Sequence, residues 1–177
     1  MEPATGYTAP AKVFHWLTAI AVLLAVPMGI AMIRIDGGPL QNQLFDLHRS
    51  FGATILALTG VRLLWRLFHP PPPPVAGPPA WQRIAARVTH YALYILLFAV
   101  PLVGWIGTSA FGAPIVVFGL FELPALVPKD RSLADLLLPI HGGLAIALTA
   151  LFLLHAAAAL HHHFVRKDAT LRRMLGG

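Results

Sequence analysis

Histidine is the residue type with which this sequence could do chemistry. The chain of 177 residues contains nine histidines and no cysteine, which excludes disulfides, thiolate-bound iron–sulfur clusters and cysteine-based zinc sites. Polar side chains within apolar segments are costly and usually persist for a functional reason. The apolar segments of this chain contain four widely separated histidines at or near their ends: His15, His48, His141 and His155.

The spacing of these four histidines predicts two sites at different depths. His141 and His155 are fourteen residues apart, which in a helix is about 21 Å and nearly four turns, so both lie within roughly 40° of one helix face. In an antiparallel arrangement His48 lies at the depth of His141, and His15 lies at the depth of His155. Each pair could therefore form a bis-histidine site near one surface of a membrane.

Haem b is the cofactor that such pairs suit best. Neutral imidazoles on facing helices can ligate haem iron axially inside a four-helix bundle. Small residues would leave room for the flat macrocycles, namely Gly52, Gly60, Gly142, Gly143 and the alanines after His155. The sequence thus predicts two b-type haems.

Several alternatives compete with this interpretation. Each histidine could simply donate a hydrogen bond to a backbone carbonyl, or the four could form a zinc or copper pathway, although such sites usually recruit carboxylate or sulfur ligands. His90 is a rival to His155, which we favour because it shares a helix face with His141. His90 or His162 could bind a quinone carbonyl and pass protons, while His161 to His163 could equally be a polar cap at the membrane surface.

The elements that must position these residues are membrane-spanning helices. Hydrophobic residues make up 57% of the chain and charged residues 11%, against about 25% charged in soluble domains. Four apolar segments approach the ~20 residues needed for a span. We expect an all-α integral membrane protein, a single domain over residues 1–177 with an antiparallel four-helix bundle whose spans cover about 12–33, 44–68, 84–107 and 139–164. Turn-forming residues occupy 36–39, 70–74, 77–79 and 124–132.

The basic residues indicate the orientation. Nine of the thirteen lie on the side that holds both termini and the loop between the second and third spans: Lys12, Arg62, Arg66, Arg83, Arg87, Arg166, Lys167, Arg172 and Arg173. The other side holds Arg34, Arg49, Lys129 and Arg131. The positive-inside rule predicts that both termini are cytoplasmic, in a bacterial inner membrane. Because these charges fall between apolar segments and do not form one face, they do not indicate a nucleic-acid surface.

Several short segments resemble the bacterial cytochrome b561 family. They are Phe14-His15-Trp16, residues 47–52 around His48-Arg49, residues 61–67, residues 155–162 and the tail segment 167–171. The resemblance runs from about Lys12 to Met174. It implies four helices and two b haems, with His15 and His155 binding one haem and His48 and His141 the other. It also implies electron exchange with ubiquinone and places His162 near the quinone.

The family type that the chain resembles most oxidises superoxide to dioxygen at the outer face and reduces ubiquinone. In that case Arg34, Arg49, Lys129 and Arg131 would attract the anion, although Arg49 could equally bind a haem propionate beside His48. The alternative function is an electron-transfer subunit that links a partner hydrogenase or dehydrogenase to the quinone pool. Membrane lipid and ubiquinone are expected contacts in either case.

Overall fold

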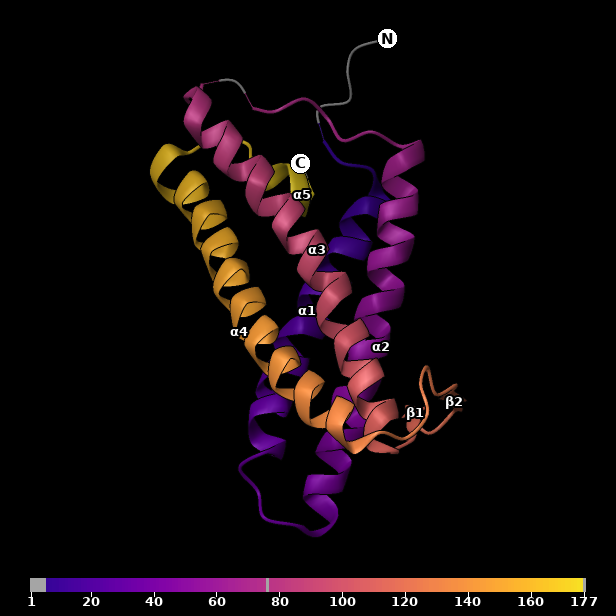
Figure 1. Cartoon of the computed structure of the whole chain (residues 1–177). Coiled ribbons are helices and arrows are strands. Elements are labelled where there is room, and N and C mark those ends of the chain that lie inside the picture. Colours follow the sequence, from indigo (N-terminus) through magenta and orange to yellow (C-terminus); the bar gives the residue numbers. More distant parts are fainter. Residues whose placement is uncertain (1–5, 76, 177) are drawn as a thin grey trace.

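The computed structural model describes residues 6–75 and 77–176, and most of them lie in four long helices (Figure 1). All four helices are long and apolar enough to cross a membrane. They are α1 (Ala9–Met32), α2 (Gly38–Phe68), α3 (Ala80–Phe111) and α4 (Arg131–His161), and α4 continues into the π-helix η1 (His162–Arg166). The helices α2, α3 and α4 begin four to eight residues before the expected spans, because apolar residues mark only the part of a helix that lies in hydrocarbon.

The helices run antiparallel and pack as two pairs. Helix α1 packs most closely on α2, and α3 packs on α4, whereas contacts between the pairs are sparser. We call the end with the α1–α2 turn and the β-hairpin the hairpin end. The opposite end, with the two termini and the proline-rich α2–α3 connection, is the terminal end. This antiparallel bundle of four membrane-spanning helices confirms the expected fold class.

Local residues explain where the helices start and stop. Gly37, with φ of 74°, lets the chain reverse between α1 and α2, and Gly112, with φ of 84°, ends α3 in the left-handed conformation. Asp130 caps α4 by accepting a hydrogen bond from the Leu133 backbone N–H. Pro27, Pro101 and Pro139 lie inside helices, which membrane helices tolerate.

A small β-hairpin, which the expected all-helical chain does not include, joins α3 to α4. Strand β1 (Ile115–Val117) pairs antiparallel with β2 (Phe121–Leu123) around a tight turn in which Phe118 and Gly119 both have positive φ. The hairpin is fixed to α2 by Ser50, whose hydroxyl accepts the Phe118 N–H at 2.9 Å and lies 3.3 Å from the Val116 carbonyl oxygen. The sheet lies before the predicted turn segment 124–132, in a part of the connection for which the sequence predicts no element.

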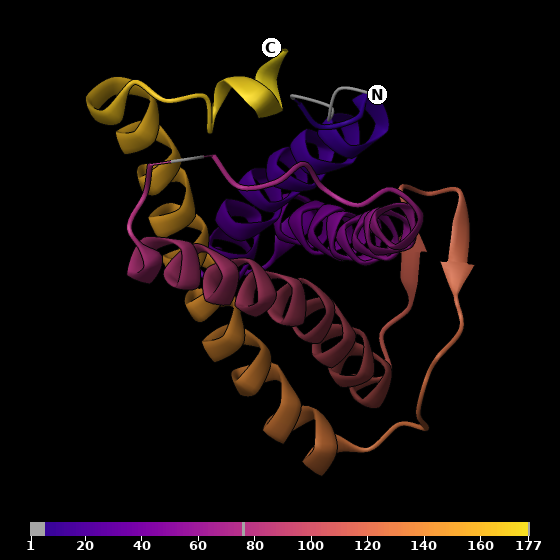
Figure 2. The same ribbon diagram turned by 90° about the horizontal axis from the view of Figure 1, so that it is seen from above.

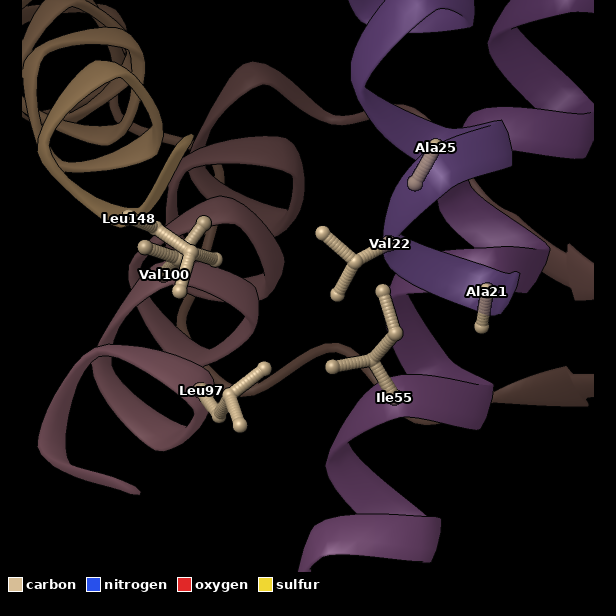
Figure 3. Packing of buried hydrophobic residues seen from close by; sticks show 7 residues of the cluster. All are labelled: Ala21, Val22, Ala25, Ile55, Leu97, Val100 and Leu148. Carbon is tan, nitrogen blue, oxygen red and sulfur yellow. The ribbon is translucent and has the colours of Figure 1, made fainter. Parts of the chain in front are cut away.

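A compact apolar cluster fills the middle of the bundle (Figure 3). Its fully buried members come from all four helices: Ala21, Val22, Ala25, Ile55, Leu97, Val100 and Leu148. Large apolar side chains also cover the outside of the helices, and Ile146 on α4 is 74% exposed. Such a surface is expected of helices that face lipid.

The C-terminal tail crosses the terminal end of the bundle. After η1 it runs from α4 toward α1 and ends in the short helix α5 (Arg172–Leu175), as the view from that end shows (Figure 2). Trp16 donates its indole N–H to the Met174 carbonyl at 3.0 Å, and Arg173 donates to the Pro73 carbonyl at 2.9 Å. The tail is thereby attached to both α1 and the proline-rich connection.

Candidate functional site

The candidate residues lie in three layers that repeat along all four helices. On each helix the members of successive layers are seven residues apart, which is two turns and about 10.5 Å. The hairpin layer consists of Gly29, His48, Gly104 and His141. The middle layer consists of Val22, Ile55, Leu97 and Leu148, and the terminal layer of His15, Arg62, His90 and His155. The middle layer belongs to the apolar cluster, so it separates two polar sites.

The hairpin layer brings the rings of His48 and His141 close together. Their ring centroids are 5.9 Å apart and the ring planes are nearly perpendicular, at 89°. His48 Nδ1 lies 2.9 Å from the Ala25 carbonyl oxygen, and His141 Nδ1 lies 2.9 Å from the Val100 carbonyl oxygen. Because a carbonyl only accepts, each Nδ1 carries a proton, and in the neutral tautomer with this proton Nε2 keeps its lone pair.

The terminal layer gathers three histidines and one arginine. The ring centroids of His15 and His155 are 6.1 Å apart, and those of His90 and His155 are 5.2 Å apart. Arg62 is close enough to interact electrostatically with all three rings. His15 Nδ1 is buried and has no hydrogen-bond partner in the described part of the chain.

The separations within two of these pairs fit a metal held between imidazoles. Two ring nitrogens that bind one metal from opposite sides, each at about 2 Å, place the ring centroids roughly 6 Å apart. The 5.9 Å and 6.1 Å separations match that value, whereas the 5.2 Å between His90 and His155 is too short. This geometry favours His15 over His90 as the partner of His155. The described residues contain no group of three or more histidines or carboxylates suited to holding a metal ion.

The glycines expected to make room for a macrocycle do face open space. A Cβ atom added at Gly52, Gly60, Gly142 or Gly143 would meet no atom of another residue within 4 Å. Two of these glycines, Gly142 and Gly143, directly follow His141, and Gly52 lies one helical turn after His48. Gly52, Gly60 and Gly142 are partly buried, so the open space beside them leaves room for a flat group, whereas Gly143 lies on the exposed surface of α4.

Arg49 is engaged with protein groups. Its guanidinium lies 3.5 Å from the Asp46 carboxylate, 3.4 Å from the Pro114 carbonyl oxygen and 5.3 Å from the centre of the Phe45 ring. The side chain is only 20% exposed. To bind a cofactor as well, the Arg49 guanidinium would have to share or give up these contacts.

His162 belongs to a separate polar cluster at the terminal end of the bundle. Its Nδ1 lies 2.6 Å from Asp168 Oδ2, and the other carboxylate oxygen accepts the Thr170 backbone N–H at 2.9 Å. Burial would raise the pKa of Asp168, but hydrogen bonds from Thr170 and His162 outweigh it and lower the pKa to about 2. No ring contact or hydrogen bond joins His162 to His90 among the described residues, and the rings of His90 and His155 are neighbours.

Comparisons with known proteins identify the family. The model of the prokaryotic cytochrome b561 family matches residues 6–177. The chain belongs to this family. It is 40% identical over 166 residues to cytochrome b561 homolog 2 of Escherichia coli strain K12, covering 92% of this chain and 87% of that protein. It is 35% identical over 161 residues to a probable superoxide oxidase of Yersinia pestis, covering 91% and 90% of the two chains.

A third relative is cytochrome b561 homolog 1 of E. coli strain K12, which is 32% identical over 166 residues and covers 91% of this chain and 92% of its own. As a member of the cytochrome b561 family, the protein is a multi-pass membrane cytochrome of the b type that binds haem b and takes part in electron transport. The predicted family and the predicted membrane bundle are therefore confirmed.

Sequence reasoning missed two residues of this cytochrome's hairpin layer. Gly29 and Gly104 lie directly against the rings of His48 and His141, and a Cβ atom at either position would come within 2.9 Å and 2.8 Å of a ring atom. The signal that could have revealed them is the seven-residue spacing from His15 to Val22 to Gly29, which recurs from His90 to Leu97 to Gly104.

Proposed function

We propose that this cytochrome binds two b haems, one between His48 and His141 and one between His15 and His155. The observation that carries the proposal is the pair of opposed imidazoles in each polar layer, 5.9 Å and 6.1 Å apart. Haem, when bound, supplies one-electron redox chemistry that amino-acid side chains lack. The chain contributes the ligands, their orientation and the apolar middle layer that keeps water from the region between the sites.

We infer that both termini are cytoplasmic and that the protein resides in the bacterial inner membrane. The terminal end carries nine of the thirteen basic residues. Basic residues concentrate on the cytoplasmic side of short loops and helix ends. The hairpin end, with His48 and His141, then faces the periplasm.

We further propose that superoxide is oxidised at the hairpin end and that ubiquinone is reduced at the terminal end. Each superoxide anion gives up one electron and becomes dioxygen, and two such electrons with two protons convert one ubiquinone to ubiquinol. The similarity to a probable superoxide oxidase across nearly the whole chain supports this substrate.

The charge of the hairpin end limits how superoxide would reach it. The four basic residues there are accompanied by five acidic ones, Asp36, Asp46, Glu122, Asp130 and Asp135, so this end has a net charge of −1. Two of the basic residues are paired, Arg49 with Asp46 at 3.5 Å and Arg131 with Asp135 at 3.0 Å. The charges therefore do not favour long-range attraction of an anion, and any attraction would come from Arg49 beside His48.

At the terminal end, His162 and Asp168 are the groups suited to supplying protons to ubiquinone. The 2.6 Å contact to Asp168 orients the ring through Nδ1 and leaves Nε2 free to hydrogen-bond a quinone carbonyl. A histidine held in this way can accept a proton from the cytoplasm and donate it to the reduced quinone. His90 is the second candidate for a quinone contact.

The test is a count of haem per chain, followed by visible spectra recorded with a superoxide-generating system and ubiquinone. We expect two low-spin b haems that superoxide reduces rapidly. His48→Ala should leave one haem without a ligand, so that one low-spin signal and superoxide oxidation are lost. His69→Ala should keep both, because His69 lies outside the two layers, where its ring stacks on Trp65 and its Nδ1 lies 3.2 Å from the Trp65 carbonyl oxygen. Two haems indifferent to superoxide would instead indicate an electron-transfer subunit for a partner dehydrogenase or hydrogenase, and absence of haem would refute the proposal.

A further inference from the structure

We infer that Gly29 and Gly104 are positioning residues for His48 and His141. In this inference, which rests on the proposed haem ligation, the two glycines expose the backbone carbonyls of Ala25 and Val100 to the histidine Nδ1–H groups. One such glycine and carbonyl lie in each helix pair, so both proposed ligands of the hairpin-end site have the same arrangement.

The two arrangements have the same geometry. In an α-helix the carbonyl of residue i binds the N–H of residue i+4, and its oxygen has a second lone pair. Ala25 is four residues before Gly29, and Val100 is four residues before Gly104. Each carbonyl has a histidine Nδ1 at 2.9 Å. The glycine occupies the position from which a side chain would cover that second lone pair.

The space at each glycine is taken up by the histidine ring. A Cβ atom on Gly29 would lie 2.9 Å from His48 Cε1 and 3.1 Å from its Nδ1. A Cβ atom on Gly104 would lie 2.8 Å from His141 Nδ1 and 2.9 Å from its Cε1. Real Cβ atoms do not approach other atoms so closely, so alanine at either position would push the ring away from its carbonyl.

The hydrogen bonds decide which ring nitrogen can bind iron and how strongly. A proton held on Nδ1 leaves the Nε2 lone pair for the metal, and donation of that proton to a carbonyl makes the imidazole a more basic ligand. At the terminal end, His15 Nδ1 is buried without a partner among the described residues. The protein therefore strengthens its hairpin-end ligands in a way that it does not strengthen His15.

The first experiment replaces a ligand by a small molecule. In holoprotein carrying His48→Ala, the empty ligand position is titrated with imidazole and with 1-methylimidazole, which cannot donate an N–H. We expect imidazole to restore the low-spin spectrum with roughly 2- to 12-fold higher affinity, the factor that one net hydrogen bond provides. The control is His15→Ala, where the preference should be smaller because no carbonyl accepts from Nδ1. Equal preference at the two positions would overturn the inference.

The second experiment changes the glycines. Gly29→Ala and Gly104→Ala should raise the midpoint potential of the hairpin-end haem and change its low-spin electron paramagnetic resonance signal, or release that haem alone. Gly107→Ala is the matched control, because its Cβ would lie 3.0 Å from the Leu138 side chain and would touch no histidine. The inference fails if both glycine variants behave like the unchanged protein, or if Gly107→Ala produces the same shift.

These outcomes are separable from failure of the proposed function. If the unchanged protein binds no haem at this site, or if His48→Ala retains both low-spin haems, then the proposed ligation is wrong. If His48→Ala loses one low-spin signal but binds imidazole no more tightly than 1-methylimidazole, the ligation stands and the positioning role is refuted.

Discussion

Arg62 occupies on α2 the position that His155 occupies on α4, since each lies fourteen residues after a hairpin-layer histidine. Among the described residues no carboxylate pairs with Arg62, whose guanidinium lies 5.3 Å from the centre of the Tyr94 ring. An unpaired cation beside a redox site stabilises the reduced form, because reduction adds negative charge. The haem proposed at the terminal end should therefore have a higher potential than its ligands alone would give it.

We expect Arg62→Gln to lower the midpoint potential of the terminal-end haem and to leave that of the other haem nearly unchanged. Redox titration monitored in the visible spectrum measures both potentials. Arg66→Gln is the control, because Arg66 is exposed, lies over the same Tyr94 ring at 5.8 Å and interacts with the terminal layer through His90, whereas Arg62 interacts with His15 and His155 as well. An equal effect of the two substitutions would show that the position of Arg62 does not matter.

Asp168 gives the cytochrome a pH dependence at its terminal end. Its folded pKa, about 2, lies below its ordinary value of 3.8, so the ionised carboxylate stabilises the tail at every pH above about 4. That stabilisation declines as the pH falls from about 4 through about 2. Asp168→Asn should remove it, and the Thr170 amide should then exchange faster at pH 6 than in the unchanged protein. A Thr170 exchange rate unaffected by the substitution would contradict the stabilising role of the carboxylate.

The pairing of the four histidines could be expected from sequence because it depends only on depth along antiparallel helices. His15, His48, His141 and His155 were predicted in that way, and the structure places each beside its expected partner. The contacts of Gly29 and Gly104 could not be predicted, because they depend on how each helix is rotated toward its neighbour. Ligation of haem by the four histidines remains a prediction.

At the scale of the elements, hydropathy located the four helices but not the β-hairpin. Strands of three residues are too short for a period of alternation to be distinguished, and the hairpin depends on a distant partner, Ser50. The Ser50 side chain accepts the Phe118 N–H at 2.9 Å while donating to Asp46 O at 2.7 Å on its own helix. Contacts 68 residues apart in sequence leave no local pattern.

Ser50→Ala should release the hairpin from α2 and destabilise the protein by about 1–3 kcal/mol, since the Phe118 N–H would lose its acceptor. Hydrogen exchange over residues 115–123 should accelerate. Thr59→Ser is the control: it shortens another buried side chain on α2 but keeps the hydroxyl that donates to the Ile55 carbonyl of the same helix at 2.6 Å. Comparable acceleration in both variants would mean that α2 packing, and not the Ser50 hydroxyl, holds the hairpin.

At the scale of the whole molecule, the orientation can be tested because the chain has no cysteine. Single substitutions Leu120→Cys, at the 79%-exposed tip of the hairpin, and Gly176→Cys, at the terminal end, introduce unique labelling positions. In cells whose outer membrane has been removed and whose inner membrane is intact, we expect an impermeant thiol reagent to label the Leu120→Cys variant and not the Gly176→Cys variant. The reverse pattern would invert the proposed topology and move superoxide chemistry to the other face.

The fourteen-residue spacing of His141 and His155 also has an electrical consequence. They separate the two sites by about 21 Å along α4, a large part of the ~30 Å hydrocarbon layer. In the proposed direction an electron moves inward, against a membrane potential that is negative inside, and a full crossing costs about 2.3 kcal/mol per 100 mV. In proteoliposomes, an inside-negative potassium diffusion potential should therefore slow ubiquinone reduction by superoxide, and its collapse should restore the rate. Electron transfer to ubiquinone would therefore be slower in a cell with a high membrane potential and faster in a cell whose potential has collapsed.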